Sequence, residues 1–353
     1  MNASPRVLLA PLSWLWGAAA AIRSALFDCG WLKQRSFGIP VICVGNLEVG
    51  GTGKTPHVEH LLRLLHARGL RTAMLSRGYG RATHGFRQAQ ADSTAAEIGD
   101  EPWQIFHNCP FATVAVCERR AEGIDRLLAA PAPPQVIVLD DAFQHRYVRA
   151  GLNILLTAAS RLYTADHLLP WGRLREPATA ARRAQLIVVT KCGEGEHPAL
   201  PVGEGQQLFY SHTRYGTPYP CFPSGCTEGA GAEEAFRGRH VTVVAGIAHP
   251  EPLARHIAAQ GADGVAVLAF PDHHRFTPGD ALRIVRAAGT EGLIATTQKD
   301  APRLAALAPQ LPESLRRRIW VQPITVDIHP ANPADASFNQ RIIDYVTSNQ
   351  RNS

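Results

Sequence analysis

The chain has 353 residues, of which 45% are hydrophobic and 19% are charged, and this composition excludes a disordered or low-complexity protein. At about 100–200 residues per domain, the length predicts two domains. The net charge of +6 gives a mild bias toward anionic partners, and the seven cysteines form no CxxC pair that would indicate a cysteine zinc site.

The amino-terminal apolar run, Val7 to Ile22, is too short to span a bilayer comfortably. A signal peptide, a buried helix and a helix in the membrane interface all remain open. A loop of the nucleotide-binding pattern follows at residues 45–56, and export would strand it in an ATP-poor compartment, which disfavours the signal peptide. Because Trp14, Trp16 and Trp31 suit headgroup depth, we assign residues 1–36 to an amino-terminal membrane-interface helical segment, although a core helix fits equally well.

From residue 37 to 205, short runs of β-branched residues alternate with longer segments whose apolar positions have helical period. Such runs, without alternation of polar side chains, are typical of strands covered on both faces. The pattern predicts an α/β domain with a parallel, doubly wound sheet. The expected strands lie at residues 42–44, 72–75, 112–116, 136–140, 153–156 and 186–190.

A Gly-, Pro- and Glu-rich stretch then marks a domain boundary, and we assign residues 206–237 to a connector. The alternation resumes in residues 238–330, which we predict to be a smaller α/β domain. The apolar segment 319–328 could pair with 208–215, so that the two domains are joined by a two-stranded connector. Residues 331–353 are expected to form a carboxyl-terminal helix and tail.

The strand at 41–44 leads into GNLEVGGTGKTP, residues 45–56. Its glycines let backbone N–H groups turn inward at the mouth of a helix, where they bind phosphate. Lys54 can reach the β- and γ-phosphates, and the Thr55 hydroxyl can ligate Mg²⁺. Glu48 occupies a position that is glycine in the strict motif, and a glycine-rich hairpin is the alternative; the strand before the loop and the helix after it favour the nucleotide site. The predicted nucleotide-binding residues are Gly50, Gly51, Thr52, Gly53, Lys54 and Thr55.

Two adjacent carboxylates, Asp140 and Asp141, end the strand at 136–140. In phosphate-loop enzymes an acidic residue at the end of a neighbouring strand holds Mg²⁺, so both are metal-site candidates, with a solvated turn as the alternative. Thr190 and Lys191 resemble the start of a guanine-recognition box, but Cys192 and Gly193 follow where that box needs an aspartate. ATP is therefore the expected nucleotide.

Further motifs occur in a fixed order along nearly the whole chain: LSRGYGR (75–81), GDEPW (99–103), LDDAFQHR (139–146), LLPWGRLREP (168–177), FPDHH (270–274) and TTQKDA (296–301). With the phosphate loop, they resemble the tetraacyldisaccharide 4′-kinase family of the lipid A pathway. Four residues depart from the family pattern, and none removes a candidate chemical group: Ala142 stands in place of glycine, Trp171 and Arg173 in place of smaller residues, and Gln298 in place of glutamate.

The resemblance implies transfer of the ATP γ-phosphate, with Mg²⁺, to the 4′-hydroxyl of a tetraacyldisaccharide 1-phosphate, giving lipid IVA and ADP. It places a peripheral enzyme at the cytoplasmic face of the inner membrane. The expected partners are the acylated disaccharide lipid and the membrane surface, and no nucleic-acid partner is expected. We expect the protein to be a monomer. A phosphate-loop ATPase of the partitioning or metal-insertion kind is the alternative, but it calls for no GDEP and DHH motifs together.

By the same resemblance, Asp100 acts as the base, paired with His273 or, as the alternative, His274. A lone aspartate titrates too low for this task near neutrality, so a histidine that shares the proton makes chemical sense. The two would come from opposite domains, and the base would then be complete only on closure. The catalytic set is Asp100, His273, Lys54 and Asp140; the substrate-binding set is Arg77, Gln144, His145, Arg175 and Glu176.

Overall fold

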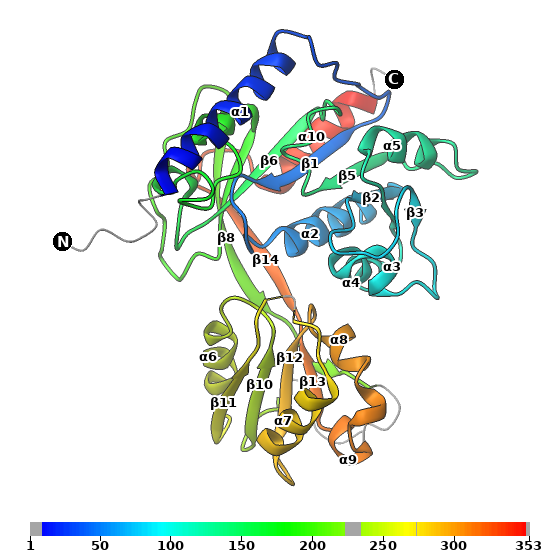
Figure 1. The fold of residues 1–353 in the computed structure, drawn as a ribbon, viewed down its shortest axis with the longest axis vertical. Coiled ribbons are helices and arrows are strands. Elements are labelled where there is room, and N and C mark those ends of the chain that lie inside the picture. The colour runs from blue at the N-terminus through cyan, green and yellow to red at the C-terminus, as the bar shows by residue number, and fades with distance from the viewer. Residues whose placement is uncertain (1–8, 223–233, 273, 351–353) are drawn as a thin grey trace, which may run out of the picture. The chain divides into compact units, whose positions relative to one another are not determined.

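The computed structural model describes residues 9–222, 234–272 and 274–350 (Figure 1). The chain divides into two compact units, one made of residues 1–213 and 326–353 and the other of residues 214–325. These limits differ from the predicted ones. Of the predicted connector 206–237, residues 206–213 belong to the larger unit and residues 214–222 to the smaller one.

The larger unit contains the amino-terminal helix, the phosphate loop and the carboxyl-terminal helix. Its helices are α1 (Ala10–Asp28), α2 (Lys54–His66), α3 (Ala95–Ile98), α4 (Asp100–Asn108), α5 (Arg120–Leu128) and α10 (Phe338–Gln350), with short 3₁₀ turns at Tyr163–Ala165 and Ala178–Arg183. Its strands are β1 (Val41–Asn46), β2 (Thr72–Ser76), β3 (Arg87–Gln88), β4 (Thr113–Val116), β5 (Val136–Asp140), β6 (Leu152–Ala158), β7 (Leu186–Thr190), β8 (Gln207–Tyr215) and β14 (Ile324–Pro330).

These strands form one sheet in the order β14-β8-β7-β6-β1-β5-β2-β4-β3. The pairs from β8 through β4 are parallel, and β3 is antiparallel to β4. Val44 and Val138 enter a core shared with α2, α4 and α10, whereas Cys43 and Leu139 enter a second core with α5. Both faces are therefore buried, which explains the continuous apolar runs in the sequence.

The predicted apolar segment 319–328 is two strands, not one, and they lie in different sheets. Pro323 separates β13 (Ile319–Gln322) from β14, and proline removes the N–H that a continuous ladder would need. Only β14 is a neighbour of β8, and this pair forms the edge of the large sheet.

The smaller unit is a second α/β sandwich, in which β13 is the fourth of five strands. Its other strands are β9 (Tyr219–Pro220), β10 (His240–Ala245), β11 (Gly264–Ala269) and β12 (Leu293–Thr297), and its helices are α6 (Glu251–Ala259), α7 (Pro278–Ala288), α8 (Ala301–Ala305) and α9 (Glu313–Arg316), with a 3₁₀ turn at Ala308–Gln310. The order is β11-β10-β12-β13-β9, with α7 and α8 in one core and α6 in the other. The carboxyl ends of β10, β11 and β12 lie at one edge because the three strands are parallel.

Candidate active site

The phosphate loop lies at the carboxyl end of β1, where the sheet order places β5 on one side and β6 on the other. Such a position is a usual ligand crevice in open α/β sheets. Gly53, directly before α2, has φ of 81°, and Gly50 has φ of 115°, backbone conformations that favour glycine. The loop leads into the amino end of a 13-residue helix, where the first N–H groups have no acceptor within the helix, and such an end suits an anion.

Asn46, the last residue of β1, hydrogen-bonds to the phosphate loop through its side chain. It was not identified from the sequence. Its side chain is fully buried, and Nδ2 donates to Thr52 Oγ1 at 2.9 Å. Its Oδ1 accepts from Lys54 Nζ at 3.4 Å and from an Arg175 guanidinium N–H. Asn46 thus connects the loop, Lys54 and the LREP segment.

Asp141 is held by cations. Arg175 donates to both of its carboxylate oxygens, at 2.8 and 3.2 Å, and Lys54 Nζ lies 3.6 Å away. Burial alone would raise the pKa of Asp141, but the Lys54 ammonium and the bound guanidinium outweigh burial and lower the pKa to about 2. Asp141 also has φ of 47°, a conformation that aspartate tolerates better than most residues.

Asp140 has the opposite environment. Its side chain ends β5 and is 4% exposed, and Oδ2 accepts from Ser76 Oγ at 3.4 Å. Within the described residues, nothing hydrogen-bonds to Oδ1. Burial, together with the negative charge of Asp141, raises the pKa of Asp140 to about 6. A buried carboxylate oxygen without a partner beside a phosphate loop fits a hard divalent cation such as Mg²⁺, which takes oxygen ligands.

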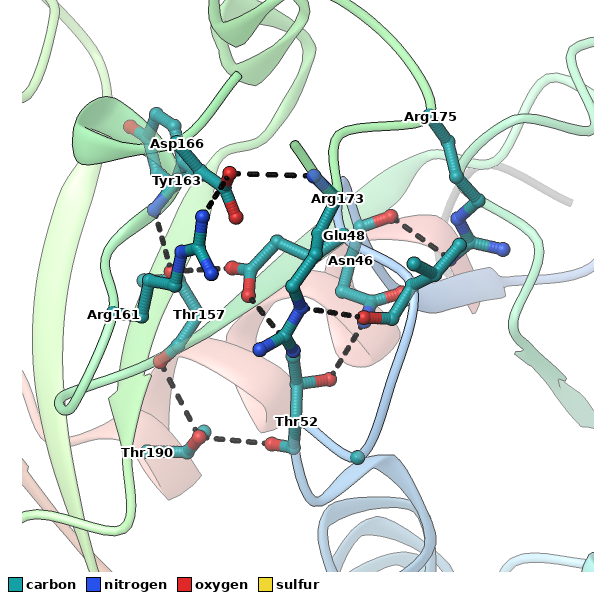
Figure 2. Close-up of polar contacts among 12 residues, drawn as sticks. Asn46, Glu48, Thr52, Thr157, Arg161, Tyr163, Asp166, Arg173, Arg175 and Thr190 are labelled. Carbon is teal, nitrogen blue, oxygen red and sulfur yellow. Dashed lines mark hydrogen bonds and ion pairs between the residues drawn. The ribbon is translucent and has the colours of Figure 1, made fainter. Parts of the chain in front are cut away.

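Glu48, the residue in place of the usual glycine, points into the protein. It is 1% exposed, and Oε1 accepts from Thr157 Oγ1 of β6 at 2.8 Å (Figure 2). Arg173 Nη2 lies 3.9 Å from the other oxygen. Burial raises the pKa of Glu48. The carboxyl group therefore fastens the start of the loop to the neighbouring strand instead of facing the ligand.

Thr190 and Lys191, at the end of β7, hydrogen-bond to the backbone of the phosphate loop. Thr190 Oγ1 donates to the Thr52 carbonyl at 2.8 Å, and Lys191 Nζ donates to the Gly51 carbonyl at 2.6 Å. The sequence shows that this segment lacks the aspartate of a guanine box. The structure gives its lysine a contact with the phosphate loop.

The SRGYG and GDEP motifs are packed against each other. Gly99, with φ of 96°, precedes Asp100 at the start of α4, and a Cβ at Gly99 would lie 3.3 Å from the Gly78 Cα. Glu101 is close enough that its charge contributes to the raised pKa of Asp140. Asp100 and the exposed Arg77 therefore flank the same edge of the sheet as the metal-site candidates.

The family comparison agrees with this geometry. The model of the LpxK family, tetraacyldisaccharide-1-P 4'-kinase, matches residues 5–343. The chain belongs to this family. Tetraacyldisaccharide 4'-kinases of Bacteroides fragilis and Bacteroides thetaiotaomicron are 45% and 44% identical to it, over 98% of this chain and 94% of each relative. The crystal structure of apo-form LpxK from Aquifex aeolicus in complex with ATP is 26% identical, with a TM-score of 0.74 over 98% of this chain and 99% of that one.

As a member of the tetraacyldisaccharide 4'-kinase family, the chain is a kinase with an α/β fold. Three residues predicted to bind substrate in this kinase make internal contacts. Gln144 Nε2 donates to the Asn46 carbonyl at 2.8 Å, and Arg175 binds Asp141. The buried Glu176 accepts from the Arg183 guanidinium, which lies over the Phe143 ring. These contacts hold the framework of the site.

His145 and Arg120 bring further titratable groups to the LDDAFQHR segment of the kinase. Burial, and after it the positive charge of Arg120, lowers the pKa of His145 to about 4, so its ring is neutral near pH 7. Arg120 itself is 2% exposed, and burial lowers its pKa to about 10 although Asp140 and Asp141 oppose this shift. Arg120 was not identified from the sequence, because an arginine at the start of a helix belongs to no motif that indicates a site.

Position 273 lies outside the described residues, so its predicted pairing with Asp100 stays a prediction. In the smaller unit, the residues on either side of it are held by side-chain contacts. Asp272 pairs with Lys299 of the TTQKDA motif at 2.9 Å, and His274 Nε2 lies 2.9 Å from the Asp280 carboxylate at the start of α7.

Helix α1 is attached to the LLPWGRLREP motif, residues 168–177 of the kinase. Trp16 Nε1 donates to the Arg175 carbonyl at 3.0 Å, Ser13 Oγ donates to the Leu168 carbonyl at 3.1 Å and accepts from the Trp171 N–H at 3.0 Å. Several large apolar side chains of α1, Trp16 among them, are exposed, which disfavours the core-helix interpretation. They are Leu12, Trp14, Leu15, Trp16 and Ile22, each at least half exposed. Among the described helices, none combines the length and apolarity needed to cross a membrane.

Proposed function

We propose that this kinase transfers the γ-phosphate of ATP to the 4′-hydroxyl of a tetraacyldisaccharide 1-phosphate, giving lipid IVA and ADP. The observation that carries the proposal is the meeting of the phosphate loop, Lys54 and the Asp140–Asp141 pair at one sheet edge, in a chain of this family. ATP binding is reported for the similar enzyme of Aquifex aeolicus. Cys192 and Gly193 follow Lys191 where a guanine-recognition box needs an aspartate, which supports ATP over a guanine nucleotide.

The chain's own residues divide the work of phosphoryl transfer. The loop from Gly50 to Gly53 and the amino end of α2 bind the phosphates, and Lys54 supplies a charge to the transferred group. Thr55 and Asp140 would hold Mg²⁺, which when bound neutralises charge between the β- and γ-phosphates. Asp141, kept ionised by Arg175, would complete the metal site.

The acceptor is a sugar hydroxyl, which must lose a proton to attack phosphorus. We assign this proton to Asp100, the first residue of α4, because its helix adjoins the metal-site edge and the family resemblance implies a base there. His273 is proposed as its partner on the same resemblance. Arg77, which is exposed beside Gly78, would bind an anionic group of the lipid.

The acyl chains of the acceptor cannot leave the bilayer cheaply, so the kinase must reach the membrane surface. The exposed apolar side chains of α1 support peripheral attachment at the cytoplasmic face of the inner membrane, where ATP is available. Since α1 is bonded to the segment that carries Arg175, attachment would hold the site near the headgroups. We propose a monomer without a nucleic-acid partner.

The test is to incubate the purified chain with Mg-ATP and the detergent-solubilised tetraacyldisaccharide 1-phosphate and to locate the new phosphate. We expect one phosphate on the 4′-oxygen and ATP consumption that depends on the lipid. Equal ATP consumption with and without the acylated disaccharide would contradict the kinase proposal and favour an ATPase of the partitioning kind.

A further inference from the structure

Arg173 lies against the phosphate loop, although the family resemblance leads us to expect a smaller residue there. The Val49 N–H donates to the Arg173 carbonyl at 2.8 Å, and the Arg175 N–H donates to the Leu47 carbonyl at 2.7 Å. Residues 173–175 thus form a short antiparallel pairing with residues 47–49. Because side chains alternate along such a strand, Arg173 and Arg175 share one face of it while Leu174 is buried on the other.

The guanidinium of Arg173 occupies the space that the missing side chain of Gly50 leaves. A Cβ at Gly50 would lie 2.8 Å from Arg173 Nη2 and 3.6 Å from Cζ. Arg173 Nε donates to the Val49 carbonyl at 3.1 Å, which fixes the plane of the group over the loop (Figure 2). The positive charge therefore stands directly beside a backbone that is built to receive phosphate.

Most of the hydrogen-bonding capacity of this arginine is unused. Among residues 9–222, 234–272 and 274–350, no hydrogen bond reaches Nη1 or Nη2, and the side chain is 37% exposed. The carboxylate near it, Glu48, is 3.9 Å away and beyond hydrogen-bond distance. Arg175, by contrast, already uses both of its Nη atoms, Nη1 on Asp141 and Nη2 on Asp141 and Asn46.

The position of Arg173 relative to Arg175 indicates which phosphate it would meet. Two residues along a strand separate side chains by roughly 7 Å. Arg175 binds Asp141, a candidate for the metal site that bridges the β- and γ-phosphates. A guanidinium on the same face, beside Gly50, is therefore within reach of the terminal phosphate.

We propose that Arg173 binds the terminal phosphate of the nucleotide in cis and neutralises part of the charge on the transferred group. The inference rests on the proposed function, because it requires ATP in the loop. An arginine suits this role, since its planar fork binds phosphate oxygens in pairs and its weak hydration makes desolvation less costly than for lysine.

The test compares two nucleotides that differ in the terminal phosphate. We would titrate the full chain with the β,γ-imido analogue of ATP and with ADP, both with Mg²⁺, by calorimetry. Arg173→Gln is expected to weaken binding of the analogue about tenfold or more, as for a charged hydrogen bond, and that of ADP less than twofold. Arg173→Lys, which keeps the charge but not the fork, should fall between wild type and Arg173→Gln for the analogue.

Arg182→Gln is the control, because Arg182 is an exposed arginine that pairs with Asp28 of α1 and has no contact with Gly50. It should leave the preference for the analogue over ADP unchanged. Equal weakening of both nucleotides by Arg173→Gln would show a structural role for Arg173 and overturn the inference, as would no weakening at all. If the wild-type chain bound neither nucleotide, the proposed function would fail together with the inference.

Discussion

Arg175 presents two N–H groups to Asp141 and a further one to Asn46. Lysine has a single ammonium and cannot reproduce this fork, and a charged hydrogen bond contributes about 1.5–3 kcal/mol. Arg175→Lys should therefore lower kcat at least about tenfold and raise the Mg²⁺ concentration needed for half-maximal activity. Steady-state kinetics with Mg²⁺ and lipid varied separately measures both effects.

The same kinetics separates a positioning role for Arg175 from the predicted binding of substrate. If Arg175 bound the lipid directly, its substitution would raise the KM for the lipid and leave the Mg²⁺ dependence as it was. Arg182→Lys serves as the control, because Arg182 is exposed and pairs with Asp28 of α1. That variant should behave like the wild type.

The sequence predicts best those site residues whose chemistry needs a fixed local spacing. The glycines, Lys54 and Thr55 are recognisable because a phosphate loop requires these types within a few positions. Asn46 and Glu48 could not be assigned, because the residues that define their roles are distant in the chain. Arg175 meets Asn46 across 129 positions, and Thr157 meets Glu48 across 109. Only the folded sheet brings such residues together.

For whole elements, the positions of the strands along the chain were easier to predict than the pairing of one strand with another. Two-sided burial leaves apolar runs that identify strands such as β5 and β7 directly. Which sheet a strand joins depends on long-range pairing, and the sequence therefore could not place β13 and β14 in different sheets. For α1, composition left a core helix and an interfacial helix equally favoured, and only the exposure of its apolar side chains distinguishes them.

Helix α1 offers a test of membrane attachment that spares its contacts with the site. Trp14 and Leu15 are 72% and 69% exposed, so replacing both by serine should not affect folding. Burial of each such side chain contributes about 1.5–3 kcal/mol, and their loss should reduce binding to vesicles more than tenfold. Activity on vesicle-embedded lipid should fall accordingly, while activity on detergent-solubilised lipid and ATP affinity stay the same. Flotation of the protein with vesicles, combined with both assays, measures this.

Point variants test the membrane attachment of α1 more specifically than removal of residues 1–30. That deletion also removes Ser13 and Trp16, which hydrogen-bond to the LLPWGRLREP motif, so it would disturb the site as well as the attachment. Leu282→Ser on α7 is the matched control, since Leu282 is 61% exposed and lies in the smaller unit. Loss of ATP affinity in the Trp14→Ser/Leu15→Ser variant would show that these side chains support the fold instead of the membrane contact.

For the whole molecule, the two units supply different parts of the proposed chemistry. Asp100 belongs to the larger unit, and the FPDHH motif with His273 belongs to the smaller one. If the two residues share the proton of the acceptor hydroxyl, neither is useful without the other. Their effects on kcat should then be strongly non-additive, as for groups that act as a unit.

The decisive measurement is a double-mutant cycle on kcat with Asp100→Asn and His273→Ala. General-base catalysis contributes about 10²–10⁴-fold, so Asp100→Asn should lower kcat by that order, and His273→Ala should lower it by a large part of the same factor. The double variant should be no slower than Asp100→Asn alone, with ATP affinity unchanged throughout. His274→Ala is the internal control, because His274 is already engaged with Asp280. If the two single losses multiply in the double variant, Asp100 and His273 act independently, and the shared proton must be abandoned.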